Sequence, residues 1–334
     1  MREHAYLRPS DPAQAVAAVA EDPDARFLAG GTNLVDHLKL GIATPGLLVD
    51  VRRLPLDALE ETDADLRIGA NVLNSDLAAH RAVRERWPAV SRALLAGASG
   101  QIRNQATTAG NLLQRTRCVY FQDRTTPCNK REPGSGCSAD DEQAYGRYNA
   151  ILGASEHCVT VHPSDFAVAL TACDATIQVL GPDGVRELPV EDLHRLPGDR
   201  PQHDTTLAHG ELITGVLLPG SATSARSTYV KVRDRASFAF ALVSVAAGID
   251  LDASGLVRDV RLAWGGVAHK PWRARAAEEA LRGATLSESA IVAAADAELA
   301  QARPAPGADY KVAMVRNATV LALRHLVPEL EESR

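Results

Sequence analysis

The sequence predicts an α+β protein with a two-lobed N-terminal part and a separate C-terminal part. Strand and helix patterns alternate over short distances before residue 97, periodicity disappears between 97 and 161, and three strand patterns precede three helix patterns after residue 225. Strands and helices that come in separate blocks indicate an α+β domain. With 334 residues, of which 46% are hydrophobic, the chain is long enough for two or three packed domains.

The first lobe, about residues 1–55, is predicted to contain a small strand-turn-helix-strand unit. The sequence Ser-Asp-Pro at 10–12 precedes an Ala/Val-rich segment, as is typical of a capped helix. The expected elements are this first helix over 13–20, a strand over 26–28, a glycine turn over 29–33, a helix over 34–40 and a strand over 47–51.

The second lobe, about residues 56–222, surrounds a long irregular loop, residues 113–161. Gly, Pro, Arg, Asn and Cys dominate much of this loop, and so long a loop inside a compact domain is either functional or disordered. The regular elements expected around it are a strand over 66–69, helices over 73–80 and 89–96, a helix over 165–172 capped by Ser164, and strands over 176–180 and 212–218. The two lobes together form the first predicted domain, residues 1–222.

The second predicted domain, residues 225–334, begins with long apolar strands and ends with helices. Strands are expected over 227–232, 242–251 and 257–266, and helices over 274–282, 287–302 and 309–325. The chain has no internal repeat and no low-complexity tract.

Composition favours a soluble chain whose partners are proteins and small molecules. The net charge is −6, and without a long block of Lys or Arg no field attracts nucleic acid or an anionic membrane. Residues 1–12 are charged, so no leader is expected, and the longest nearly apolar run, 238–249, is too short for a membrane span of about 20 residues. A cytoplasmic location is the plain expectation, and export with a leader-bearing partner is the alternative.

Two glycine-bearing segments could bind a ligand that contains phosphate. In LAGGTNL at 28–34, a strand passes into a helix through two glycines, which let a ligand approach the backbone, and free N–H groups at a helix start attract phosphate. The segment ATTAGNL at 106–112 adds hydroxyl and amide groups for a diphosphate or a ribityl chain. Taken singly, each segment is also explained as a structural turn.

Four of the five cysteines gather in the irregular loop, in the order Cys118-x9-Cys128-x8-Cys137-x20-Cys158. Thiolates hold iron–sulfur clusters and structural zinc, and the Arg and Lys residues of this loop would offset the charge of a Cys-ligated cluster. The spacing matches no short ligand motif, so free thiols or disulfides stay open. Cys173 falls in an apolar helix and is expected to be a packed free thiol.

The two glycine-bearing segments together resemble the paired FAD-binding segments of flavin subunits in the molybdenum hydroxylase family, to which xanthine dehydrogenases and aldehyde oxidoreductases belong. Ser164-Asp165 and YVKVRDR at 229–235 match in the same order. The resemblance implies a two-lobed FAD-binding domain of the PCMH type (type 2) and an α+β C-terminal domain of the CO dehydrogenase flavoprotein type. The FAD-binding residues it implies are Leu28, Ala29, Gly30, Gly31, Thr32, Asn33, Leu34, Thr107, Thr108, Ala109, Gly110, Asn111, Asp165, Ile213 and Lys231.

The cysteine loop resembles one branch of that family, the bacterial aldehyde oxidoreductase type, whose flavin subunit carries an extra [4Fe–4S] cluster. The similar stretches are 110–118, 128–131, 133–137, 157–158 and 162–165. The resemblance implies a [4Fe–4S] cluster whose ligands are Cys118, Cys128, Cys137 and Cys158.

Such a chain would be an electron-transfer subunit, without catalytic residues of its own. The implied complex adds a large molybdenum cofactor-binding subunit and a small [2Fe–2S] subunit, and electrons would leave through FAD to an external acceptor. Two alternatives stay open. One is a self-sufficient flavin oxidase or reductase, which needs no cysteine cluster, and the other is a zinc-stapled binding protein whose glycine turns are structural.

Overall fold

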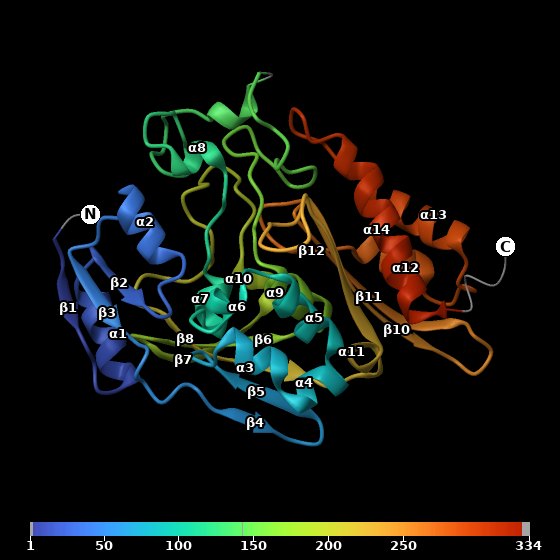
Figure 1. The fold of residues 1–334 in the computed structure, drawn as a ribbon, viewed down its shortest axis with the longest axis horizontal. Coiled ribbons are helices and arrows are strands. Elements are labelled where there is room, and N and C mark those ends of the chain that lie inside the picture. Colours follow the sequence, from blue (N-terminus) through green and yellow to red (C-terminus); the bar gives the residue numbers. More distant parts are fainter. Residues whose placement is uncertain (1–2, 142, 329–334) are drawn as a thin grey trace.

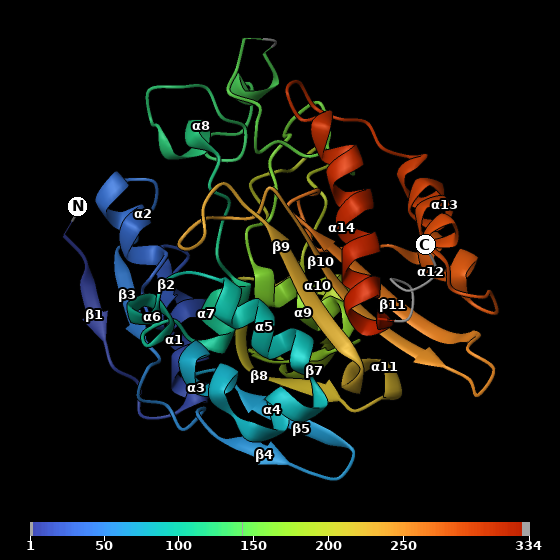
Figure 2. The ribbon, with the colours of Figure 1, turned by 45° about the vertical axis from the view of Figure 1, so that its right-hand side comes forward.

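The computed structural model describes residues 3–141 and 143–328. These residues contain three separate sheets, each the framework of one part of the molecule (Figure 1). The irregular loop around α8 (Val119–Gln122) lies at the open end, between α2 (Leu34–Leu40) of the small lobe and α14 (Tyr310–Leu326) of the C-terminal part (Figures 1 and 2).

The small lobe is a parallel sheet in the order β1-β3-β2. Its strands are β1 (Ala5–Leu7), β2 (Ala25–Leu28) and β3 (Leu47–Asp50), and helix α1 (Pro12–Glu21) joins the first two. Asp11 caps α1, since its carboxylate accepts a hydrogen bond of 2.8 Å from the Gln14 N–H. The sequence predicted this unit apart from β1.

The large lobe is built on a five-stranded antiparallel sheet in the order β4-β5-β8-β6-β7. Its strands are β4 (Leu59–Glu61), β5 (Asp65–Gly69), β6 (Thr176–Gly181), β7 (Gly184–Pro189) and β8 (Leu212–Pro219). Its helices are α3 (Asn74–Ala79), α4 (Arg81–Arg86), α5 (Pro88–Ala96), α6 (Gly100–Arg103), α7 (Thr108–Leu112), α9 (Asp165–Ala172) and α10 (Val190–Leu193).

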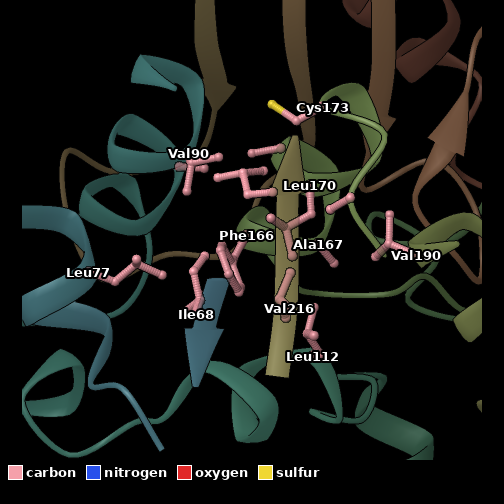
Figure 3. Packing of buried hydrophobic residues seen from close by; sticks show 14 of the residues in the cluster. Ile68, Leu77, Val90, Leu112, Phe166, Ala167, Leu170, Cys173, Val190 and Val216 are labelled. Atoms are coloured by element: carbon pink, nitrogen blue, oxygen red, sulfur yellow. The ribbon is translucent and has the colours of Figure 1, made fainter. Parts of the chain in front are cut away.

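The main core lies between this sheet and the helices α5 and α9 (Figure 3). Ile68 of β5 and Val216 of β8 pack in one cluster with Phe166 and Leu170 of α9, and none of the four is more than 1% exposed. Cys173, just after α9, is buried in the same core, and burial raises its pKa to about 12. It is a packed free thiol, as the sequence predicted.

The C-terminal part is a four-stranded antiparallel sheet in the order β12-β11-β10-β9, with helices against it. Its strands are β9 (Ser227–Val232), β10 (Val243–Leu251), β11 (Val257–Gly265) and β12 (Trp272–Arg273). Its helices are α11 (Ala222–Ala225), α12 (Arg275–Leu281), α13 (Glu288–Leu299) and α14. Helix α14 packs on β9 and β10, and α9 of the large lobe contacts β10 and β11.

The predicted order of strands and then helices is present in this part, and each expected boundary lies within three residues of the observed one. No helix in residues 3–141 and 143–328 is both long and apolar enough to cross a bilayer.

Candidate functional site

A cavity of about 570 Å³ opens between the two lobes and the C-terminal sheet. It falls within the range of roughly 300–1,000 Å³ typical of ligand pockets. Residues from both predicted flavin-binding segments, from the start of α9 and from β9 line it, among them Thr32, Asn33, Gly110, Asn111, Ser164, Asp165 and Lys231. Four segments that are far apart in the sequence therefore meet at one cavity.

The other predicted FAD-binding residues are Leu28, Ala29, Gly30, Gly31, Leu34, Thr107, Thr108, Ala109 and Ile213, and they belong to the surrounding framework rather than to the cavity lining. The Thr107 hydroxyl caps α7 by accepting a hydrogen bond of 3.2 Å from the Gly110 N–H. The buried Thr108 hydroxyl donates to the Val72 carbonyl at 3.1 Å. Ile213 is 1% exposed and belongs to the main core.

The two glycines of the first segment have different roles. A Cβ on Gly30 would lie 2.0 Å from the Gln105 carbonyl oxygen, so only glycine lets this turn touch the chain that leads into α7. Gly31 has a φ of +75°, a left-handed conformation that side chains with a Cβ disfavour. Gly30 thus brings the two predicted segments together, and Gly31 turns the chain into α2.

Two asparagines connect the segments around the cavity. The Asn33 Oδ1 accepts a hydrogen bond of 2.9 Å from the backbone N–H of Arg115, which follows the second segment. The Asn111 Oδ1 accepts one of 2.7 Å from the Ser164 hydroxyl, and Ser164 in turn caps α9. Asn33 therefore positions the backbone at Arg115 and Asn111 positions the Ser164 side chain, and both asparagines also line the cavity.

Asp165 and Lys231 form a buried ion pair in the cavity wall. The Lys231 Nζ donates to the Asp165 Oδ2 at 2.7 Å, and the Tyr229 hydroxyl donates to the other carboxylate oxygen at 2.5 Å. The side chains of Asp165 and Lys231 are only 8% and 4% exposed. Burial, reinforced by the Asp165 charge, raises the pKa of Tyr229 well above its usual value, so this phenol stays a donor.

The lining also contains a buried acceptor that no described residue satisfies. The Asn74 side chain faces this cavity, and its Oδ1 has no hydrogen-bond partner. Leaving such an atom unpaired costs about 1–3 kcal/mol, which a ligand donor would recover. The hydroxyl, amide and backbone groups of the lining fit a polar dinucleotide such as FAD.

The four loop cysteines line a second, small cavity beside the first. Cys128 and Cys137 pair across an isolated antiparallel bridge, and Cys158 pairs with Ser155 in a turn. All the cysteines are free thiols. Among the described residues, no group of three or more His, Cys, Asp or Glu side chains is arranged to hold a metal ion.

Burial keeps the thiols of Cys118, Cys137 and Cys158 protonated in the absence of a ligand. It raises the pKa of Cys158 to about 12, with a smaller opposing effect of Lys130, and it also raises the pKa values of Cys118 and Cys137. A cysteine thiol loses its proton when it binds a metal as a thiolate. The donor set, several thiols with a cation beside them, is chemically suited to an iron–sulfur cluster.

A charge network around the buried Lys130 fixes the base of the cysteine loop. The Lys130 ammonium, 1% exposed, donates to the Asp204 Oδ1 at 2.5 Å, and the Arg115 guanidinium donates to the other oxygen at 2.6 Å. Burial alone would raise the pKa of Asp204, but Arg115 and Lys130 outweigh it and hold the pKa below its usual range. Asp204 therefore links Lys130 of the cysteine loop to Arg115, whose backbone N–H contacts Asn33.

The two cavities share part of their walls. Thr116, Cys118 and Thr160 line both, and the hydroxyls of Thr116 and Thr160 are hydrogen-bonded to each other. Ligands in the two cavities would consequently be close neighbours.

The sequence did not predict several of the residues that line the large cavity. Arg117, Asn74 and the β9–β10 connection, including Phe238 and Phe240, face the large cavity. Arg117 precedes a predicted cluster ligand, and the sequence pattern gives no sign of which cavity its side chain enters. Asn74 begins a short helix, where a polar residue is unremarkable.

Comparison with known families defines the class of protein. Residues 2–221 match the family described as the FAD binding domain in molybdopterin dehydrogenase, and residues 227–326 match the CO dehydrogenase flavoprotein C-terminal domain. The chain belongs to the FAD-binding subunits of the molybdenum hydroxylase family, which are oxidoreductase subunits.

The chain is 51% identical, over 336 residues, to the aldehyde oxidoreductase FAD-binding subunit PaoB of Escherichia coli K12, with 100% of this chain and 99% of that protein covered. It is 26% identical to the carbon monoxide dehydrogenase medium chain of Hydrogenophaga pseudoflava, over 95% of each chain.

Solved structures have the same fold. A carbon monoxide dehydrogenase chain from Hydrogenophaga pseudoflava superimposes with a TM-score of 0.74 at 27% identity, covering 96% of both chains. Quinoline 2-oxidoreductase from Pseudomonas putida 86 gives a TM-score of 0.74 at 22% identity, covering 98% of both chains. The predicted fold class, the family and FAD as cofactor are confirmed; the individual ligand residues and the cluster stay predictions.

Proposed function

We propose that this chain is the FAD- and [4Fe–4S]-carrying electron-transfer subunit of a molybdenum-dependent oxidoreductase that acts on an aldehyde or a xanthine-type heterocycle. The observation that carries the proposal is the pair of adjoining cavities, one lined by the flavin-binding segments and the other by four cysteines. The similarity to an aldehyde oxidoreductase FAD-binding subunit supports the aldehyde as substrate class.

In this proposal the residues that line the large cavity would hold the flavin. Thr32, Asn33, Gly110 and Asn111 would bind the diphosphate, and the Asp165–Lys231 pair would contact the sugar and ring portions. Bound FAD supplies the exchange of electrons between the partner subunits and an external acceptor. No acid, base or nucleophile of this chain acts on the organic substrate.

Cys118, Cys128, Cys137 and Cys158 are the proposed ligands of the cluster. Their convergence on one cavity, all as free thiols, supports this assignment. Lys130 in the same wall offsets the negative charge that four thiolates and a cluster bring. His157, beside Cys158, is proposed to stay outside the ligand set.

The proposed partners are a large molybdenum cofactor-binding subunit and a small [2Fe–2S] subunit, since the names of similar proteins describe them as medium chains or FAD-binding subunits. The proposed location is the cytoplasm, with export alongside a leader-bearing partner as the alternative. Fractionation of cells that produce the whole complex would distinguish the two.

The absorption spectrum of the purified full-length chain, with iron, sulfide and zinc analysis, tests the proposal. We expect flavin bands with a broad iron–sulfur shoulder and about four iron atoms per flavin. Flavin bands without iron would favour the self-sufficient flavin enzyme. A colourless protein that contains zinc would instead favour the zinc-stapled binding protein.

A second measurement separates an electron-transfer subunit from a self-sufficient enzyme. An aldehyde added anaerobically to the isolated chain should leave the flavin oxidised, whereas the same aldehyde should bleach the flavin in the complete complex. Bleaching of the flavin in the isolated chain would contradict the proposal that the aldehyde is oxidised by another subunit.

A further inference from the structure

The cationic side chains of the large cavity differ in whether they already have partners. Four of them line it: Arg103, Arg117, Lys231 and Arg235. Arg103 donates to the Gly97 carbonyl at 2.6 Å, and Lys231 is paired with Asp165. Arg235 donates to the Phe238 carbonyl at 2.9 Å. Arg117 alone makes no hydrogen bond and no ion pair with the described residues.

One contact locates the Arg117 side chain. Its guanidinium carbon lies 5.0 Å from the centre of the Phe240 ring, in the β9–β10 connection. Asp36 of α2 lines the same cavity. Arg117 therefore belongs to a cavity wall that also includes the helix following the first glycine segment and the aromatic connection of the C-terminal sheet.

The guanidinium faces the flavin cavity rather than the sulfurs. Arg117 is absent from the lining of the cysteine cavity, to which both neighbours in sequence, Thr116 and Cys118, contribute. Lys130 is instead the cation of that lining. Arg117 and Lys130, two basic residues of the same loop, therefore line different cavities.

A half-buried guanidinium without an acceptor requires an anion. An arginine stays protonated in a protein, and a charge taken partly out of water needs an opposite charge or hydrogen-bond acceptors. The planar fork of N–H donors matches a phosphate better than an ammonium does. In oxidised FAD the diphosphate is the anionic part.

We propose that Arg117 binds the diphosphate of FAD, so that the cysteine loop supplies a direct contact to the flavin nucleotide. This inference rests on the FAD-binding function and adds one residue to it. It also gives the loop a role in flavin retention besides its proposed role in holding a cluster.

The test is the affinity of the full-length chain for FAD, measured by fluorescence titration of flavin-depleted protein that retains its iron. Arg117→Ala should raise the Kd for FAD about 10- to 100-fold, the range expected for one lost charge-assisted contact. Arg117→Lys should give an intermediate Kd, because it keeps the charge but loses the fork. Arg124→Ala, an exposed change of equal charge in the same loop, is the control and should match the wild type.

Salt dependence distinguishes a phosphate contact from general damage to the cavity. The Kd of the wild type should rise with ionic strength, and that dependence should weaken in Arg117→Ala. An Arg117→Ala protein with the affinity of the Arg124→Ala control, or an unchanged salt dependence, would overturn the inference. Loss of iron with full FAD affinity would do so as well, since Arg117 would then be a counter-ion of the cluster.

Failure of the inference is separable from failure of the proposed function. If the wild-type chain binds no FAD, the function itself is wrong. If it binds FAD with an affinity that does not depend on Arg117, only the inference is wrong. Should Arg117→Ala not fold, Arg117→Lys and the salt dependence of the wild type still decide the matter.

Discussion

Replacement of Gly30 by alanine should separate the two flavin-binding segments. The added Cβ would lie 2.0 Å from the Gln105 carbonyl oxygen, whereas real Cβ contacts are essentially never under 3.0 Å. The backbone must therefore move by about 1 Å, because a carbonyl cannot rotate away as a flexible side chain can. Overpacking of this kind costs about 1–3 kcal/mol. The melting temperature should fall by roughly 2–10 °C.

Gly100→Ala is the matched control, because a Cβ at this exposed helix start meets no atom within 4 Å. Thermal unfolding and the molar ratio of FAD to protein should be measured for both variants. We expect the control to match the wild type, and Gly30→Ala to lose both stability and FAD. Equal melting temperatures and equal FAD contents in the two variants would refute the role assigned to this close approach.

Three other changes have defined outcomes. Cys128→Ser should remove or destabilise the cluster while FAD remains, whereas Cys173→Ser, in the core, should leave the iron content unchanged; equal iron contents would count against the ligand set. Lys130→Met should lower the iron content, because it removes the cation beside the thiolates; iron retained at the wild-type level would argue that this charge is not needed. Burial lowers the pKa of Lys311 to about 7, so the unfolded chain binds more protons between about pH 7 and 10.5, and stability relative to Lys311→Met should rise with pH across this window. Denaturant unfolding at several pH values checks this, and a flat difference would contradict it.

The Lys311 prediction agrees with the contacts of its amine. The Nζ donates to the Asn149 and Gly266 carbonyls at 2.8 and 2.9 Å, and it forms no ion pair with a carboxylate of the described residues. A neutral amine can still donate two hydrogen bonds, so both contacts survive deprotonation. The charge itself is what the buried site opposes.

Long elements with clear periodicity were predictable from the sequence, whereas short ones were not. The helix expected over 309–325 is α14, because seventeen residues give several turns of a repeating apolar face. The sequence did not predict β7. Only one of its six residues is buried, so the strand lacks the alternation of apolar and polar residues by which a strand is recognised. α6 and α7, of four and five residues, are set by their caps Ser99 and Thr107 and by tertiary contacts rather than by periodicity.

The site was predictable at the level of segments but not of side-chain direction. The sequence brought the glycine turn, the threonine-rich segment and Ser164-Asp165 into one hypothesis, and all three reach one cavity. The sequence could not show that Gly30 allows the backbone to approach the Gln105 carbonyl closely, because this approach depends on how two distant segments pack. Nor could it show that Arg117 and Lys130, both in the cysteine loop, face different cavities.

The charge network at Asp204 limits how this chain could be reduced to a minimal flavoprotein. Excision of the cysteine loop from Thr116 to Thr160 would remove Lys130 and leave the Asp204 carboxylate with Arg115 as its remaining short contact. Removing the buried cation from a partly buried carboxylate strongly destabilises the folded state. The truncated chain therefore needs a compensating change at Asp204. Asp204→Asn is the simplest companion substitution, because an amide accepts the Arg115 hydrogen bond without carrying the unbalanced charge.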